Sequence, residues 1–80
     1  MDASLDDLIV DARGLDPPEP MERILDALAA LEKEQRVRLR IHREPFPLYR
    51  ILQQNGYAWR TTYDPEQGFE LLIWEPAQAG

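Results

Sequence analysis

Residues 14–20, "GLDPPEP", interrupt the regular structure of the chain, because three prolines fall in one short stretch. Proline fixes φ and lacks a backbone N–H, so neither a strand nor the interior of a helix can run through these residues. The glycine that opens the stretch suits a sharp turn. We expect Asp16 to cap a following helix with its carboxylate, Pro17 or Pro18 to occupy the first helical position, and Pro20 to lie in the first turn.

The spacing of apolar residues differs on the two sides of this stretch. Residues 7–12, "DLIVDA", form a short apolar run bounded by acids, which is typical of a strand buried on both faces. Residues 18–33 place apolar side chains at helical spacing, with Glu19 and Arg23 spaced for an ion pair one turn apart. The apolar stripe of this helix consists of Met21, Ile24, Leu25, Leu28 and Leu31.

The rest of the chain predicts three more strands and a second helix. Residues 36–42, "RVRLRIH", alternate strictly between polar and apolar, as a half-buried strand does. Residues 44–56 restore helical spacing, with a proline in the first turn and a glycine after the last. Residues 57–63 and 69–75 predict two strands that the turn at 64–68 joins into a hairpin. The strand residues expected to face inward are Val37, Leu39, Ile41, Phe69, Leu71 and Ile73, and the aromatic residues expected in core or helix–hairpin packing are Phe46, Tyr49, Tyr57 and Trp59.

The predicted order is therefore β-α-β-α-β-β, an α+β fold built as an α/β two-layer sandwich. The first strand–helix–strand unit implies a right-handed parallel crossover, and the hairpin adds antiparallel pairing. We expect a mixed four-stranded sheet with two helices on one face and the other face open to water. We interpret residues 1–80 as a single domain, with an ordered core at about 7–75 and loose termini.

Composition limits the chemistry that this chain can perform. The 80 residues contain no cysteine and one histidine, so we expect no disulfide, no thiol chemistry, no metal site and no cofactor. The formal net charge of -6 disfavours nucleic acid and anionic membranes as partners. With neither a membrane-length apolar run nor a signal pattern, the expected location is the cytoplasm.

The first candidate site is the open face of the predicted sheet. Alternation places Arg36, Arg38, Arg40 and His42 on that face, with Leu72 and Trp74 of the last strand also pointing outward. Arginines beside an outward-facing tryptophan have the composition of a protein interface. The alternative is a solvated face whose arginines pair with Asp11 or Glu70 across strands.

The second candidate site is the corner where the first strand turns into the first helix. It comprises Arg13, Gly14, Pro17, Pro18, Glu19 and Pro20. Free amides of a helix start and the guanidinium of Arg13 could together grip an anion. The neighbouring acids Asp11, Asp16 and Glu19 oppose such binding, so a structural salt bridge of Arg13 is the alternative. We identify no catalytic residue in either candidate site.

At this corner the sequence resembles the TusA/SirA-like sulfur-carrier superfamily. Those proteins carry a strand, an Asp-x-Arg-Gly turn, a leucine and a Cys-Pro-x-Pro helix start. The matching frame here is Asp11, Ala12, Arg13, Gly14, Leu15, Asp16, Pro17, Pro18, Glu19 and Pro20. The resemblance runs from about Leu8 to Ile73 and implies the same β-α-β-α-β-β fold. A second stretch, "REPFPLYRILQQNGYAW" at 43–59, is similar to the signature of the DUF2249 family, a branch of that superfamily.

The resemblance also implies a loss of function, because Pro17 stands where the carriers have their persulfide-bearing cysteine. Sulfur transfer by the usual route is therefore not expected, and we expect no enzymatic activity. Our first hypothesis is a non-catalytic interaction module that docks a partner protein through the open sheet face or the corner. The alternative is the binding or sensing of a small ligand or anion at the start of the first helix. Members of the branch often lie near nitrogen-oxide respiration genes, so this alternative implies a link to sulfur or nitrogen-oxide metabolism. Either a monomer or a weak homodimer is compatible with the sequence.

Overall fold

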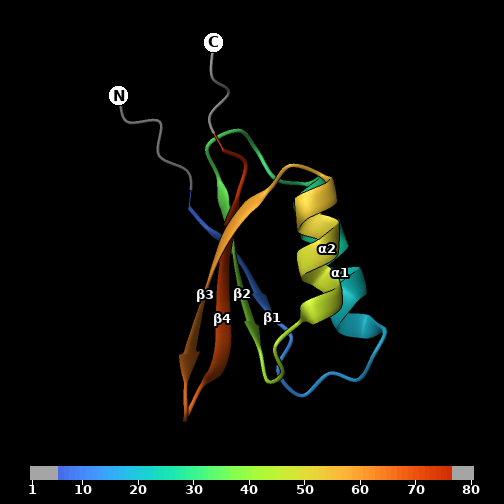
Figure 1. Ribbon diagram of the computed structural model, residues 1–80, viewed down its shortest axis with the longest axis vertical. Coiled ribbons are helices and arrows are strands. Elements are labelled where there is room, and N and C mark those ends of the chain that lie inside the picture. Colours follow the sequence, from blue (N-terminus) through green and yellow to red (C-terminus); the bar gives the residue numbers. More distant parts are fainter. Residues whose placement is uncertain (1–5, 77–80) are drawn as a thin grey trace.

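The computed structural model describes residues 6–76 and contains two helices and four strands in the predicted order (Figure 1). The termini predicted to be loose lie largely outside these residues. Within 6–76, no helix is long and apolar enough to cross a membrane. The elements are β1 (Leu8–Asp11), α1 (Glu19–Ala29), β2 (Arg36–Ile41), α2 (Phe46–Gln54), β3 (Ala58–Asp64) and β4 (Gly68–Trp74).

The four strands form one mixed sheet in the order β1-β2-β4-β3. β1 runs parallel to β2, whereas β4 pairs antiparallel with both β2 and β3. Both helices lie on the same side of the sheet (Figure 1), so the predicted fold class and two-layer architecture are confirmed. The register places Val37 opposite Ile73 and Leu39 opposite Leu71, which sets the apolar side chains of the two central strands side by side.

The core lies between this sheet and the two helices. Its buried members are Ala12, Ile24, Leu28, Val37, Leu39, Leu48, Leu52, Leu71 and Ile73. The alternation of β2 and β4 accounts for the sheet side of the core, and helical spacing accounts for the other side. Leu31 follows the end of α1 but still packs against the core. Glu19 and Arg23 form the predicted ion pair, at 3.0 Å.

The structure corrects three predictions about burial. β1 is not buried on both faces, because the helices cover only one face of the sheet and Ile9 on the open face is 57% exposed. Leu25 is 41% exposed and does not belong to the buried stripe, since the face of α1 that meets the sheet is centred on Ile24 and Leu28. Phe46, the first residue of α2, is 66% exposed and forms a T-shaped ring pair with Tyr49 instead of entering the core.

Candidate functional site

The chain turns sharply between β1 and α1 in residues 14–20, which we call the corner segment. Gly14 has a φ of 81°, the left-handed conformation that its position in the turn requires. The predicted cap by the Asp16 carboxylate is wrong, because α1 begins at Glu19 after Pro18, and no side chain caps it. Consecutive prolines keep the residues before them out of helical conformation, so the cap position falls on a residue that has no capping side chain. Pro20 lies in the first turn as predicted.

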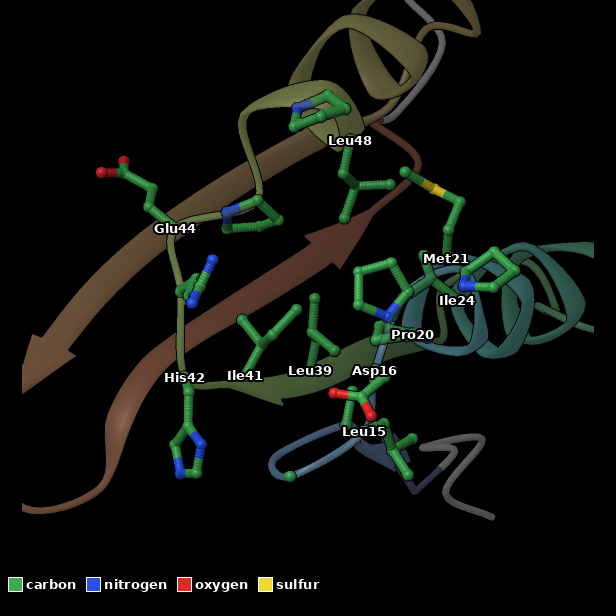
Figure 2. Close-up of a pocket in the computed structure, with 17 residues that line it drawn as sticks. Leu15, Asp16, Pro20, Met21, Ile24, Leu39, Ile41, His42, Glu44 and Leu48 are labelled. Carbon is green, nitrogen blue, oxygen red and sulfur yellow. The ribbon is translucent and has the colours of Figure 1, made fainter.

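An open cavity of about 470 Å³ lies between the corner segment and the connection from β2 to α2. Figure 2 shows Met21 of α1 and Leu48 of α2 pointing toward one another across it, while the imidazole of His42 points away from them. The cavity is lined by Ala12, Gly14, Leu15, Asp16, Pro17, Pro18, Pro20, Met21, Ile24, Leu39, Ile41, His42, Arg43, Glu44, Pro45, Pro47 and Leu48.

The walls of this corner cavity are mainly apolar and conformationally restricted. Its floor includes Ile24, Leu39 and Leu48, which are also members of the core. Prolines from both loops form much of the wall, and their fixed φ limits how far the wall can move. The charged or polar side chains in the lining are Asp16, His42, Arg43 and Glu44. The cavity therefore offers an apolar interior surrounded by groups of both charges.

Glu44 is held in place from α2 and β3. The Tyr49 hydroxyl donates to Glu44 Oε2 at 2.9 Å and lies 2.8 Å from Thr61 Oγ1. The Tyr49 ring stacks on Trp59, with centroids 5.5 Å apart. Burial raises the pKa of Tyr49, and the nearby Glu44 carboxylate acts in the same direction, whereas the hydrogen bond with Thr61 opposes them. These contacts join one side of the cavity rim to the sheet.

Arg13 does not belong to the cavity lining. Its guanidinium donates to both oxygens of Asp11, each at 2.8 Å, and to Gln67 Oε1 at 2.8 Å. The side-chain hydrogen bonds from Arg13 are the main reason that the pKa of Asp11 is lowered to about 2. The alternative of a structural salt bridge for Arg13 is therefore confirmed.

The start of α1 offers few free amides to an anion. The Glu19 N–H donates to the Asp16 carbonyl at 3.0 Å, and Pro20 has no N–H. The carboxylates of Asp16 and Glu19 are both exposed at the same helix start. The predicted convergence of free amides and a guanidinium is thus not formed around the cavity.

The open face of the sheet carries the predicted arginines. The register sets Arg36 opposite Trp74, Arg38 opposite Leu72 and Arg40 opposite Glu70. Leu72 and Trp74 are half-buried there, and His42 is exposed just beyond the end of β2.

These arginines are joined by two carboxylates. Asp7 pairs with Arg36 at 3.2 Å and with Arg38 at 3.0 Å, while Glu70 pairs with Arg38 at 3.0 Å and with Arg40 at 3.4 Å. The hydrogen bond with Asp7 is the largest cause of the raised pKa of Arg38. Pairing with Glu70 was one of the sequence-based alternatives. The expected partner Asp11 is bonded to Arg13 instead.

Two features of these sites were missed by sequence reasoning. Residues 42–48 form the second wall of the corner cavity. The sequence signal for this wall was the pair of prolines at 45 and 47, which makes the segment proline-rich like the corner segment. Asp7 was treated as a strand boundary, yet its side chain is only 15% exposed and bridges two arginines. Within residues 6–76, no cluster of three or more acidic or histidine side chains is arranged to hold a metal ion.

Together these features define a small two-layer α+β domain with an apolar surface cavity on the helix side and an ion-paired open sheet face. The chain belongs to the DUF2249 family, whose model, described as "Uncharacterized conserved protein (DUF2249)", matches residues 9–75. This match confirms the family that residues 43–59 indicated. Comparisons with curated proteins and with solved structures gave no significant match.

Proposed function

We propose that this protein is a non-catalytic interaction module that docks a partner protein by inserting an apolar side chain of the partner into the corner cavity. The observation that carries the proposal is the cavity itself, an apolar depression with a charged rim and walls stiffened by prolines. Protein interfaces have this anatomy, with an apolar anchor in a desolvated pocket and polar groups around it. A restricted wall also lowers the entropic cost of binding.

The corner cavity is a better docking site than the open sheet face. Arg36, Arg38 and Arg40 all have carboxylate partners on their own chain. A partner that bound these arginines would first have to displace Asp7 or Glu70, and the lost ion pairs would offset much of the binding free energy gained. No such exchange is needed at the cavity, where the binding surface is mainly apolar.

A small molecule in the same cavity is a second candidate ligand. The volume of about 470 Å³ lies within the usual range for small-molecule sites, about 300–1,000 Å³. An uncharged, mainly apolar molecule fits this lining better than an anion, because most of the lining is apolar and its one arginine, Arg43, is accompanied by the acids Asp16 and Glu44. The guanidinium of Arg13 is held by Asp11 and Gln67.

We also propose that the domain is a sulfur-carrier fold that has lost its reactive residue. By the resemblance, Pro17 occupies the position of the carrier cysteine. Pro17 lines the cavity, and the chain contains no cysteine that could replace the missing one. Because the cavity lies beside this position, we propose that the domain keeps a binding surface of the sulfur carriers and uses it without sulfur transfer. We place the domain in the cytoplasm as part of this proposal.

The test compares two tryptophan substitutions on one helix. Met21→Trp fills the cavity, because Met21 lines it, whereas Leu25→Trp adds the same side chain to an exposed position one turn later and outside the lining. Each variant and the wild type are isolated from the protein's own cells at physiological salt and measured by native mass spectrometry. Circular dichroism and urea unfolding verify that both variants fold.

We expect a second protein to accompany the wild type and Leu25→Trp but not Met21→Trp. A small-mass adduct with the same pattern would instead select the small-molecule candidate. If a partner is retained by Met21→Trp and lost when Arg38 and Arg40 are both replaced by alanine, the docking site is the open sheet face and the cavity proposal is wrong.

A further inference from the structure

β3 is an edge strand whose outer side has no partner within the sheet. All seven of its residues pair with β4, and the strand order leaves its other side at the sheet boundary. Residues 58–64 contain no proline or glycine that would interrupt further pairing. An uninterrupted edge of this kind is a template for another strand, and proteins that stay monomeric usually block it.

We propose that β3 pairs antiparallel with β3 of a second copy of this chain, with Thr62 opposite Thr62 at the two-fold axis. In this register Arg60 faces Asp64 of the second copy, and the symmetry repeats the pair. The register sets Arg60 beside Leu72, so the side chain of Arg60 lies on the open side of the sheet. Asp64 is four residues further along the same strand and lies on the same side. Within residues 6–76, neither Arg60 nor Asp64 forms an ion pair, so both charges are available to the second copy.

Charge favours this register over those shifted toward the start of β3. With Arg60 on the axis, two guanidinium groups would oppose each other, which destabilises a cross-strand pair. With Thr61 on the axis, Arg60 would face Thr62 and form no ion pair. The Asp64 side chain is also held in place, because its Oδ1 accepts from the N–H groups of Glu66 and Gln67 at 2.7 and 3.1 Å.

The helix side of β3 supports the same register. Tyr63 and Phe46 are the two most exposed of the large apolar residues, at 62% and 66%. With Thr62 on the axis, Tyr63 lies opposite Thr61 of the second copy. Thr61 contacts the hydroxyl of Tyr49, and the rings of Tyr49 and Phe46 form a T-shaped pair. Pairing would therefore bring Tyr63 to the side of β3 where Tyr49 and Phe46 of the other copy lie, and would reduce the exposure of Tyr63.

The position of the axis also leaves room for the helices. The tip of the β3–β4 hairpin extends beyond the first turn of α2 (Figure 1), and Thr62 lies in the half of β3 nearer that tip. In the dimer the two β3 strands overlap only in the halves nearer their hairpin tips, and the rest of each copy extends in opposite directions along the strands. The helices of the two copies are therefore offset along the strands and do not collide. The result is one continuous sheet from two copies, with all helices on the same side.

The test uses the absence of cysteine from the chain, which allows one thiol to be placed by substitution. Opposed residues of antiparallel strands have Cα atoms about 4.5–5.5 Å apart, within the range that a disulfide spans. Thr62→Cys is therefore expected to form a disulfide-linked dimer under mild oxidation. Ala58→Cys is the control on the same strand and face, and in this register its two copies are separated by about 27 Å.

Sedimentation across a concentration series measures the uncross-linked dimer. We expect Arg60→Glu to raise the dimer dissociation constant by about tenfold or more, because two like-charged contacts replace two ion pairs, while Arg60→Lys keeps most of the affinity. Tyr63→Ala should also weaken the dimer. The proposal is overturned if the wild type sediments as a monomer throughout, if Arg60→Glu leaves the dimer intact, or if Thr62→Cys links no faster than Ala58→Cys. Because no residue of β3 lines the corner cavity, these results are independent of the docking test.

Discussion

The guanidinium of Arg13 binds the carboxylate of Asp11 through two parallel hydrogen bonds, each 2.8 Å long. A third contact, from the Arg13 backbone N–H to Asp11 Oδ1 at 3.2 Å, closes the turn that follows β1. The same guanidinium reaches Gln67 in the β3–β4 turn at 2.8 Å. Arg13 thus links two turns that are distant in the sequence, and this structural role leaves it outside the corner cavity.

This bonding should be visible in the titration of Asp11. Its pKa is lowered to about 2, chiefly by the side-chain hydrogen bonds from Arg13, so Arg13→Ala should return it toward the ordinary value of about 3.9. Since the folded pKa lies below the unfolded one, the stabilisation is present above about pH 4 and is lost as the pH falls toward 2. Carboxyl NMR titration measures the shift, with Arg23→Ala as a control that should leave Asp11 unchanged.

The ion-paired arginines should contribute unequally to stability. Arg38 contacts both Asp7 and Glu70 and has a side chain 31% exposed, whereas Arg36 contacts Asp7 alone and is 50% exposed. We expect Arg38→Ala to lower the free energy of unfolding by about 1 kcal/mol and Arg36→Ala by less than about 0.5 kcal/mol. Urea unfolding at low and high salt tests this order. Equal losses for the two variants would contradict the bridging role of Arg38.

The Tyr49 hydroxyl should contribute to stability in a way that the Tyr63 hydroxyl does not. Tyr49→Phe removes contacts with Glu44 and Thr61 while keeping the ring on Trp59, and should cost about 1–2 kcal/mol. Tyr63→Phe, at an exposed position, should be nearly neutral at concentrations where the protein is monomeric.

The raised pKa of Tyr49 adds a pH dependence to this comparison. Because the folded pKa lies above the unfolded value of about 10, this stabilisation is present below pH 10 and is lost as the pH rises through the folded pKa. Ultraviolet titration should show a tyrosine whose pKa lies above the ordinary value of about 10. Its disappearance in Tyr49→Phe, and its persistence in Tyr63→Phe, would identify the residue.

Two leucines of α1 that look alike in the sequence should respond differently to truncation. Leu28 is buried, whereas Leu25 is 41% exposed. Leu28→Ala should cost about 2–5 kcal/mol, and Leu25→Ala should stay within about 0.5–1 kcal/mol. Chemical denaturation of the pair measures both. A large loss in Leu25→Ala would mean that α1 faces the sheet through a different side.

We expect that the corner segment does not activate a thiol. Pro17→Cys places a thiol where the proposed relation to sulfur carriers would put their cysteine, but the Glu19 N–H is already bonded, Pro20 has none, and acids flank the site. We expect its alkylation at neutral pH to be no faster than that of an unstructured peptide cysteine. A rate well above the peptide value would show that the helix start still stabilises a thiolate.

The fold could be predicted from the sequence because its signals are local. The alternation of residues 36–41 specified which side of β2 is buried, and Leu39 and Val37 lie in the core as expected. The glycine at 56 follows α2 with a φ of 79°, as its position in the pattern indicated. Spacing and turn chemistry depend on neighbours in the chain, so they can be recognised without a structure.

The wrong predictions concern choices that depend on distant elements. A short apolar run such as residues 8–10 suits a strand covered on one face or on both, and only the packing of both helices on one face of the sheet leaves Ile9 exposed. The helical stripe of α1 admits Leu25 as readily as Leu28 until the sheet selects the side that it covers.

The sequence by itself thus determined the order of elements, the alternation of the central strands and the absence of any cysteine. Only the tertiary structure decided which acids neutralise the arginines, where Arg13 is bound, and that residues 42–48 meet the corner segment to form a cavity. The physical reason is the distance along the chain over which the interactions act. Backbone conformation follows from adjacent residues, whereas ion pairs and cavities arise from side chains that meet only after the sheet and helices have packed.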